Sequence, residues 1–194
     1  MEKIEIAMTE LKYNRKWIEY KLINKQYVCK EYEKFTKSAD KNTEHYRYNS
    51  FKKLLKEESF FTDEKIKYYV ELAEIDENQA MGTSAIIELI CCKYLTNEQF
   101  ANIWNYLPKD NPVLDKVYNR ERLLRCLLNT TDLTQEVFSL TFSTDESVIH
   151  LALINRNDLS YNQLFLLSTL GKTKVIRNLA KVSLRRFCKI NSCL

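Results

Sequence analysis

The sequence predicts an all-α protein, more specifically a right-handed α-solenoid of about four helical hairpins behind an N-terminal helical cap. The first observation is composition. The chain of 194 residues contains two glycines and two prolines, and the first of these is Gly82. Turns between β-strands depend on glycine and proline far more than turns between helices do. Their scarcity therefore favours helices throughout the chain.

The second observation is a helix-start motif that recurs four times after residue 60. Its clearest copies, NTTDLTQEVF (129–138) and NRNDLSYNQLF (155–165), both read N-x-x-D-L-[S/T]. The hydroxyl can accept from an unpaired N–H group of the first helical turn, and the flanking apolar residues can pack as a hydrophobic staple. The predicted N-caps are Thr62, Thr96, Thr134 and Ser160, with Gln99 and Gln163 completing a capping box at two of them.

The third observation is that each predicted start is followed by two helices separated by a polar turn. The first helices are expected at 63–75, 97–107, 135–142 and 161–169. The second helices are expected in SAIIELICCKY, NRERLLRCLLN, ESVIHLALIN and TKVIRNLAKVSLRRF. Helix pairs that recur at such intervals are typical of α-solenoids, in which each hairpin packs on its neighbours.

The segment before the repeats has a different pattern. We expect one long helix from Thr9 to Phe35, a polar break over 36–44 and a further helix over 45–58. A terminal hairpin is needed to cover the bare face of the first repeat. The predicted organisation is therefore a helical cap region, 1–58, and a repeat region, 59–194, in one continuous domain.

The segment VIHLALINRNDLSYNQLFLLSTLGKTKVIRNLAKVSL (148–184) resembles the short helical repeats of the leucine-rich-repeat-variant and HEAT-like families. The resemblance covers residues 120–184 well and 60–119 loosely. It departs from these families in its irregular period and in having no proline after the cap. It implies a binding scaffold and no particular chemistry, because such repeats host many functions.

Charge is distributed unevenly along the chain. Residues 1–56 contain 14 basic and 8 acidic residues, residues 57–171 contain 9 and 18, and residues 172–194 contain seven basic residues and no acid. The net charge of +4 therefore conceals two basic ends and an acidic middle. This arrangement suits a protein partner of mixed charge.

The last predicted helix carries the principal candidate binding surface. Its basic residues recur at helical spacing, and Val175, Leu179, Val182 and Phe187 are expected to form the apolar, packing side. Three alternatives stay open: a solvated end of the solenoid, a docking surface for an acidic protein, and contact with nucleic-acid phosphates. The candidate residues are Lys174, Arg177, Lys181, Arg185, Arg186 and Lys189.

A secondary candidate surface lies near the N-terminus, where basic and aromatic residues alternate. Such residues suit single-stranded nucleic acid, whose bases stack on aromatic rings. The alternative is that the rings serve packing and that the Lys, Asn and Tyr content reflects an AT-rich coding background, as in phages and low-GC bacteria. The residues are Arg15, Lys16, Trp17, Tyr20 and Arg47.

No catalytic, cofactor or metal motif is present in the sequence. It lacks the glycine-rich phosphate loops, the H-E-x-x-H metal motif and the G-x-S-x-G nucleophile motif. His150 stands among apolar residues and is expected to be partly buried and bonded to backbone or to a neighbouring repeat. The six cysteines lack zinc-site spacing. A HEAT-like DNA glycosylase, with Trp17, Trp104, Asp110 and Asp115 as candidates, is opposed by the acidic middle of the chain.

We therefore expect a non-catalytic scaffold, an adaptor or an inhibitor that acts through protein–protein contacts, phage origin being one alternative. The competing hypothesis is a nucleic-acid-binding protein that uses the basic C-terminal helix and the N-terminal aromatic-basic segment. No signal peptide and no membrane span is expected, because the start is charged and no apolar run is long enough. The expected location is the cytoplasm, or the host cytoplasm for a phage protein, and no cofactor is expected.

Overall fold

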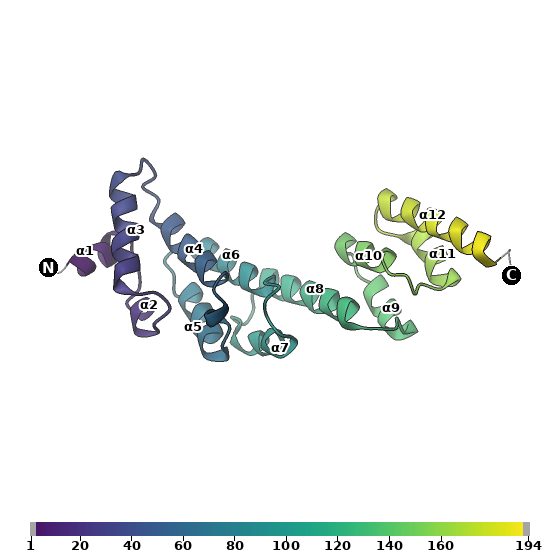
Figure 1. Ribbon diagram of the computed structural model, residues 1–194, viewed down its shortest axis with the longest axis horizontal. Coiled ribbons are helices and arrows are strands. Elements are labelled where there is room, and N and C mark those ends of the chain that lie inside the picture. Colours follow the sequence, from purple (N-terminus) through teal and green to yellow (C-terminus); the bar gives the residue numbers. More distant parts are fainter. Residues whose placement is uncertain (1–2, 192–194) are drawn as a thin grey trace. The chain divides into compact units, whose positions relative to one another are not determined.

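The computed structural model describes residues 3–191, with side chains described as far as Cys188. All regular structure in this range is helical, which confirms the all-α prediction (Figure 1). The elements are α1 (Lys3–Glu10), α2 (Lys16–Glu19), α3 (Lys25–Lys37), α4 (Thr43–Leu54), the 3-10 helix η1 (Glu58–Phe60), α5 (Asp63–Glu74), α6 (Gln79–Ile90), α7 (Asn97–Tyr106), α8 (Pro112–Asn129), α9 (Gln135–Phe142), α10 (Ser147–Ile154), α11 (Tyr161–Leu170) and α12 (Lys174–Asn191).

The chain divides into two compact units, residues 1–118 and residues 119–194, called unit 1 and unit 2 below. The boundary falls inside α8. Each unit has its own hydrophobic core. The sequence predicts a different division, between residues 58 and 59, at the point where the repeats begin. The two compact units do not test where the repeats begin, so this boundary stays a prediction.

The four predicted helix starts are confirmed. The hydroxyl groups of the four predicted N-cap residues accept from the backbone N–H three residues on, and they begin α5, α7, α9 and α11. Capping boxes form at Thr96 with Gln99 and at Ser160 with Gln163. The motif therefore places the first helix of each predicted hairpin to within a residue.

Loss of a cap hydroxyl is expected to destabilise its helix. Thr134→Ala and Ser160→Ala should each lower the free energy of unfolding by roughly 0.5–2 kcal/mol, since one N–H group of the first turn loses its acceptor. Native-state hydrogen exchange in α9 and α11 measures the change. Thr131→Ala, at an exposed position whose hydroxyl bonds to none of the described residues, is the matched control. No change at either cap would contradict the assignment.

The predicted single helix from Thr9 to Phe35 is wrong, because the structure breaks it twice. Lys12 and Lys21 take left-handed conformations, with φ of 58° and 53°. In each case the next residue's N–H bonds a carbonyl five residues back, Tyr13 to Met8 and Leu22 to Trp17. This is the Schellman helix end, in which glycine usually occupies the left-handed position. With lysine at both positions, the sequence contains no glycine to signal the breaks.

In unit 1, helices α5 and α6 approach each other closely at Gly82. A Cβ built on Gly82 of α6 would lie 2.0 Å from the carbonyl oxygen of Ala73 on α5. Gly82 is therefore required by packing, and it lets α5 and α6 lie against one another. Tyr69 of α5 strengthens the same contact by donating a hydrogen bond to the carbonyl of Ala85.

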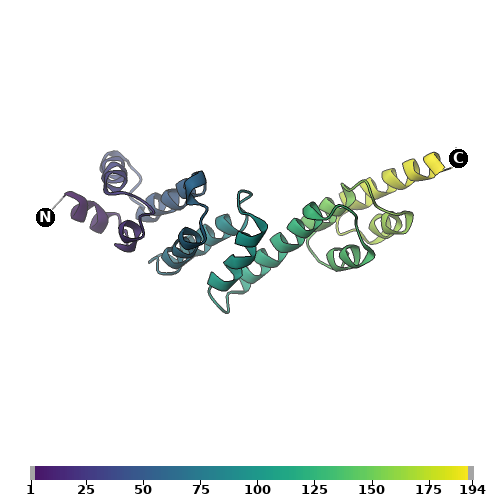
Figure 2. The same cartoon turned by 60° about the horizontal axis from the view of Figure 1, so that its bottom comes forward.

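Unit 2 is built from α9 to α12 with the end of α8. Helix α11 packs along α12, α9 packs on α10, and α10 contacts both α11 and α12 (Figures 1 and 2). Arg156 and Asp158, in the turn before α11, form a two-bond ion pair at 2.6 and 2.8 Å. Arg156 also donates to the carbonyls of Leu127 and Thr130 at the end of α8, and Asp158 accepts from the N–H of Leu133. These hydrogen bonds, together called the clamp below, connect the end of α8, the turn before α9 and the turn before α11.

The clamp makes the stability of unit 2 depend on pH. The hydrogen bonds from Arg156 lower the pKa of Asp158 from 3.8 to about 2, so the ionised form is favoured by folding. The contribution is present above about pH 4 and is lost as the pH falls toward about 2. Asp158→Asn should cost about 1–2 kcal/mol near neutral pH, after allowance for the carboxylate's partial exposure, and much less near pH 2.

Native-state hydrogen exchange of unit 2 amides at the two pH values tests this linkage. The matched control is Asp132→Asn, because Asp132 holds the equivalent position in the first copy of the motif and is exposed. We expect little change in this control at either pH. Equal losses at both pH values in Asp158→Asn would contradict the linkage.

Candidate functional site

Helix α12 packs against the rest of unit 2 through the side that carries Ile176 and Ala180, and both of these residues are buried. The turn before it is narrow, since a Cβ on Gly171 would lie 2.8 Å from the side chain of Ile176. Arg177 fixes the same turn by donating to the carbonyl of Gly171 at 2.7 Å. These contacts determine which sides of α12 face solvent.

The predicted packing side of α12 is wrong in three of its four positions. Val175, Leu179 and Val182 are 64%, 41% and 44% exposed, and only Phe187 is partly buried against the core. Ile176 stands about 100° further round the helix than Val175, so the buried stripe is displaced by roughly a quarter turn. The helix therefore exposes an aliphatic ridge beside its basic residues.

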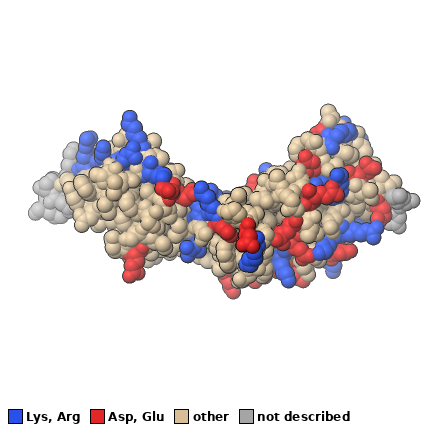
Figure 3. Space-filling view, turned by 180° about the vertical axis from the view of Figure 1, so that it is seen from behind, with Lys and Arg blue, Asp and Glu red and all other residues tan. Residues whose placement is uncertain are grey.

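The basic residues of α12 form the predicted cationic stripe. Lys174, Lys181, Arg185 and Arg186 are exposed, while Arg177 is half-buried by its bond to Gly171. Figure 3 shows Lys and Arg side chains gathered over α12 at the end of unit 2. The side chain of Lys189 lies outside the described residues.

Exposed apolar side chains are concentrated in unit 2. Among the described residues, fifteen large hydrophobic side chains are exposed, and ten of these lie in unit 2 although it is the smaller unit. A concentration of exposed large apolar side chains is typical of interaction sites on soluble proteins. The ten residues are Leu128, Leu140, Val148, Leu151, Tyr161, Phe165, Leu170, Val175, Leu179 and Val182.

Helical spacing places Val148 and Leu151 of α10 on one apolar face with Ala152 and Ile154, but it does not indicate that these two side chains are exposed. A signal for their exposure was present, because SVIHLALI is apolar on nearly every side. A helix that is apolar on every side must expose apolar side chains to solvent unless it is completely buried. Here Ile149 and Leu153 are buried while Val148 and Leu151 are each 41% exposed.

The secondary candidate surface is not brought together as predicted. Trp17 and Arg47 are buried, at 1% and 2% exposure, so neither is accessible to a ligand, and their assignment to a binding surface is corrected. Trp17 packs on the ring of Phe51. Arg47 forms a two-bond pair with Asp76 at 2.7 and 2.9 Å.

The other three residues of this surface have acidic partners in the fold. Lys16 and the hydroxyl of Tyr20 both donate to Glu71, whose pKa is lowered chiefly by the hydrogen bond from Lys16. The ring of Tyr20 is stacked on Tyr68 at 3.8 Å. Arg15 is exposed and pairs with Glu5 at 2.8 Å. The positive charge expected here is therefore largely neutralised.

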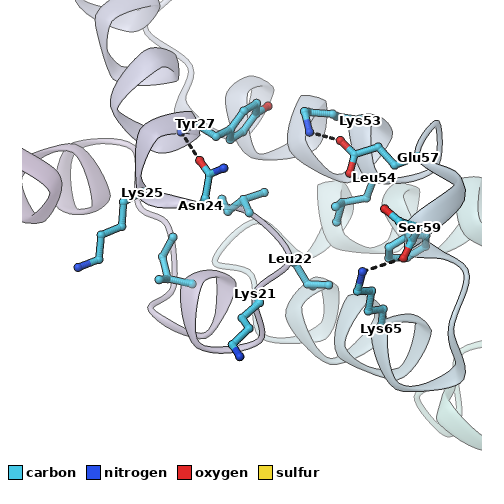
Figure 4. A pocket seen from close by; sticks show the side chains of 13 residues that line it. Lys21, Leu22, Asn24, Lys25, Tyr27, Lys53, Leu54, Glu57, Ser59 and Lys65 are labelled. Carbon is cyan, nitrogen blue, oxygen red and sulfur yellow. Dashed lines mark hydrogen bonds and ion pairs between the residues drawn. The ribbon is translucent and has the colours of Figure 1, made fainter.

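A cavity of about 530 Å³ lies in unit 1 and is lined by four lysines (Figure 4). Lys53 pairs with Glu57, and Lys65 donates to the carbonyl of Ser59 at 2.7 Å. The ammonium groups of Lys21 and Lys25 point away from the other two. The charges do not converge on one point, so the cavity is not preformed for a phosphate or carboxylate.

His150 is a structural residue, as predicted. It is buried, its Nδ1 accepts from the N–H of Lys172 at 3.1 Å, and its Nε2 faces the carbonyls of Phe142 and Thr144 at 3.0 and 3.1 Å. This pattern requires the proton on Nε2 and uses both ring nitrogens. No nucleophile is among its partners.

The remaining candidates for chemistry do not form a site. Trp104 packs on Tyr118, with Lys109 over its ring at 5.6 Å, and neither Trp104 nor His150 lines the lysine cavity. Cys91 is exposed, while Cys92 is partly buried against the core of unit 1. Within the described range, no group of three or more His, Cys, Asp or Glu side chains is placed to hold a metal ion.

Comparisons with protein-family models, with curated proteins and with solved structures found no match to this chain. Among the described helices, none combines the length and apolar composition needed to cross a lipid bilayer. The resemblance to HEAT-like repeats therefore stays a prediction, and function has to be argued from the surfaces of the molecule.

Proposed function

We propose that this chain is a non-catalytic binding scaffold, an adaptor or an inhibitor, that holds a partner protein on unit 2. The observation that carries this function is the concentration of exposed large hydrophobic side chains there. Exposed apolar surface costs solubility unless a partner covers it. The cationic stripe of α12 adds selectivity, because complementary charge speeds association and rejects wrong partners.

The proposed architecture behind this function is the α-solenoid of about four hairpins. Its support is the shared start motif and the packing of neighbours within each unit, α5 on α6 and α7 in unit 1, and α10 and α11 on α12 in unit 2. Solenoid repeats present extended surfaces on which macromolecules bind. The α1–α4 segment would then be the N-terminal cap, consistent with the contact of α4 on α6.

Cross-linking mass spectrometry on the tagged chain, purified from its native cell, tests the scaffold. We expect a protein recovered in stoichiometric amount and cross-linked through the lysines of unit 2, which are Lys172, Lys174, Lys181 and Lys189. The lysines of unit 1 serve as the internal control. Recovery of no stoichiometric protein, or cross-links confined to unit 1, would contradict the proposal.

Nucleic-acid binding is the second candidate, favoured by the exposed cations of α12. Replacing Lys174, Arg177, Lys181, Arg185 and Arg186 with glutamine should then abolish mobility shifts of DNA and RNA. Binding should also weaken steeply between about 50 and 200 mM salt, since phosphate contacts release counterions. Absence of any shift at the lower salt concentration would exclude this candidate. A shift that survives the five changes would place the contact elsewhere.

A further inference from the structure

We propose that the exposed aliphatic side chains of α10 and α12 form the docking face for an acidic amphipathic helix of a partner protein. This inference rests on the proposed scaffold function and specifies the kind of partner. The face consists of Val148 and Leu151 on α10 and Val175, Leu179 and Val182 on α12, and it is called the α10–α12 face below.

The spacing of these side chains fits a helical partner. Val175, Leu179 and Val182 recur at i, i+4 and i+7 and so form one ridge along α12. Val148 and Leu151 recur at i and i+3 on α10, which packs against α12. A helix that presents its own residues at i, i+3, i+4 and i+7 is the usual ligand of such aliphatic surfaces.

The ridges point away from the core of unit 2. On α12 the buried residues are Ile176 and Ala180, which lie about 100° further round the helix than the ridge. On α10 the buried residues are Ile149 and Leu153. The exposed aliphatic residues are therefore additional to those that hold the unit together, and substituting them should leave its fold intact.

The charges around the face point to an acidic occupant. Lys174, Lys181, Arg185 and Arg186 are exposed, and within the described residues none of the four has an acidic partner. Residues 172–188 contain no acid. Arg186 continues the ridge one turn beyond Val182, so cations border the α12 ridge along its side and at its end. A partner helix with carboxylates flanking an apolar stripe matches both features.

Other occupants fit the face less well. Nucleic acid would use the cations alone, since phosphates gain nothing from valine or leucine side chains. Among its described side chains, α12 exposes no aromatic residue, whereas helices that bind membrane surfaces usually place Trp or Phe on the apolar side. A second copy of α12 would bring like charges together.

The test uses a labelled acidic amphipathic peptide, with leucine at i, i+3, i+4 and i+7 and glutamate on the remaining faces, and fluorescence anisotropy with the full chain. One control peptide has the same composition in an order that leaves no apolar face. A second keeps the leucines and replaces glutamate with lysine. A single-stranded oligonucleotide and vesicles of equal parts phosphatidylserine and phosphatidylcholine complete the set. We expect binding of the first peptide only.

Two variants separate the apolar and charged contributions. Val175→Ser/Leu179→Ser/Val182→Ser should weaken peptide binding at least about tenfold, because most of the aliphatic contact is removed. Lys174→Gln/Lys181→Gln/Arg185→Gln should weaken binding and reduce its dependence on salt. The matched control, Ile75→Ser/Val113→Ser, changes aliphatic side chains of similar exposure in unit 1 and should bind like the wild type. Circular dichroism confirms that each variant is folded.

Each of the remaining outcomes overturns the inference. These are equal binding of the reordered peptide, binding unaffected by the triple serine variant, absence of peptide binding, and tighter binding of the oligonucleotide or the vesicles. The scaffold function is judged separately by the cross-linking experiment. A stoichiometric partner cross-linked to unit 2 but insensitive to the triple serine variant would retain the function and reject the α10–α12 face.

Discussion

Gly82→Ala is expected to destabilise unit 1 by roughly 2–4 kcal/mol, which reverses the usual sign of this substitution. Inside a helix, alanine normally stabilises by about 1 kcal/mol relative to glycine. At residue 82 the new Cβ would lie 2.0 Å from the carbonyl oxygen of Ala73, and the backbone fixes the positions of both atoms. No side-chain rotation can relieve it, so α5 and α6 must move apart and lose packing.

Urea unfolding followed by tryptophan fluorescence measures this effect in unit 1 alone. Both tryptophans of the chain, Trp17 and Trp104, belong to that unit. Ser84→Ala, on the exposed side of the same helix, is the matched control and should change stability little. If Gly82→Ala stabilised the chain, as a glycine-to-alanine change in an exposed helix normally does, the close approach of α5 and α6 would be wrong.

The sequence predicted the helix starts well because a cap is a local signal. A hydroxyl, an apolar residue before it and another four residues after it all lie within six positions, and all four starts were confirmed. The two helix ends at Lys12 and Lys21 were not predicted, since their usual signal is a glycine that this sequence lacks. A helix start or end could therefore be predicted where it is marked by the residue type that usually occupies it.

The candidate site was predicted less completely because burial depends on distant residues. The cationic stripe of α12 could be read from spacing alone. Which apolar stripe of α12 packs is decided by α10 and α11, so Val175, Leu179 and Val182 were assigned to the wrong side. Arg47 was assigned to the surface for a similar reason, as its partner Asp76 is 29 residues away in the chain. A periodic pattern shows which residues share one side of a helix, but it does not show which other element packs against that side.

The buried pair of Arg47 and Asp76 leads to the second large prediction. Asp76→Ala should destabilise unit 1 by about 3–5 kcal/mol, because the guanidinium would stay buried without its counter-charge. Its remaining partners, the carbonyl of Leu11 and the hydroxyl of Thr43, are neutral. Asp76 also accepts from the N–H of Asn78 before α6, so the loss extends to the α5–α6 turn.

A double-mutant cycle distinguishes a buried pair from two independent contributions. Arg47→Met/Asp76→Ala should be more stable than Asp76→Ala alone, since the unpaired charge is then removed as well. The neighbouring pair of Lys12 and Glu77, at 2.9 Å, is exposed and provides the matched control. Glu77→Ala should leave the urea midpoint of tryptophan fluorescence nearly unchanged, because water replaces the lost contact. Additive losses from Arg47→Met and Asp76→Ala would show that the two side chains are not coupled, and would contradict the buried pair.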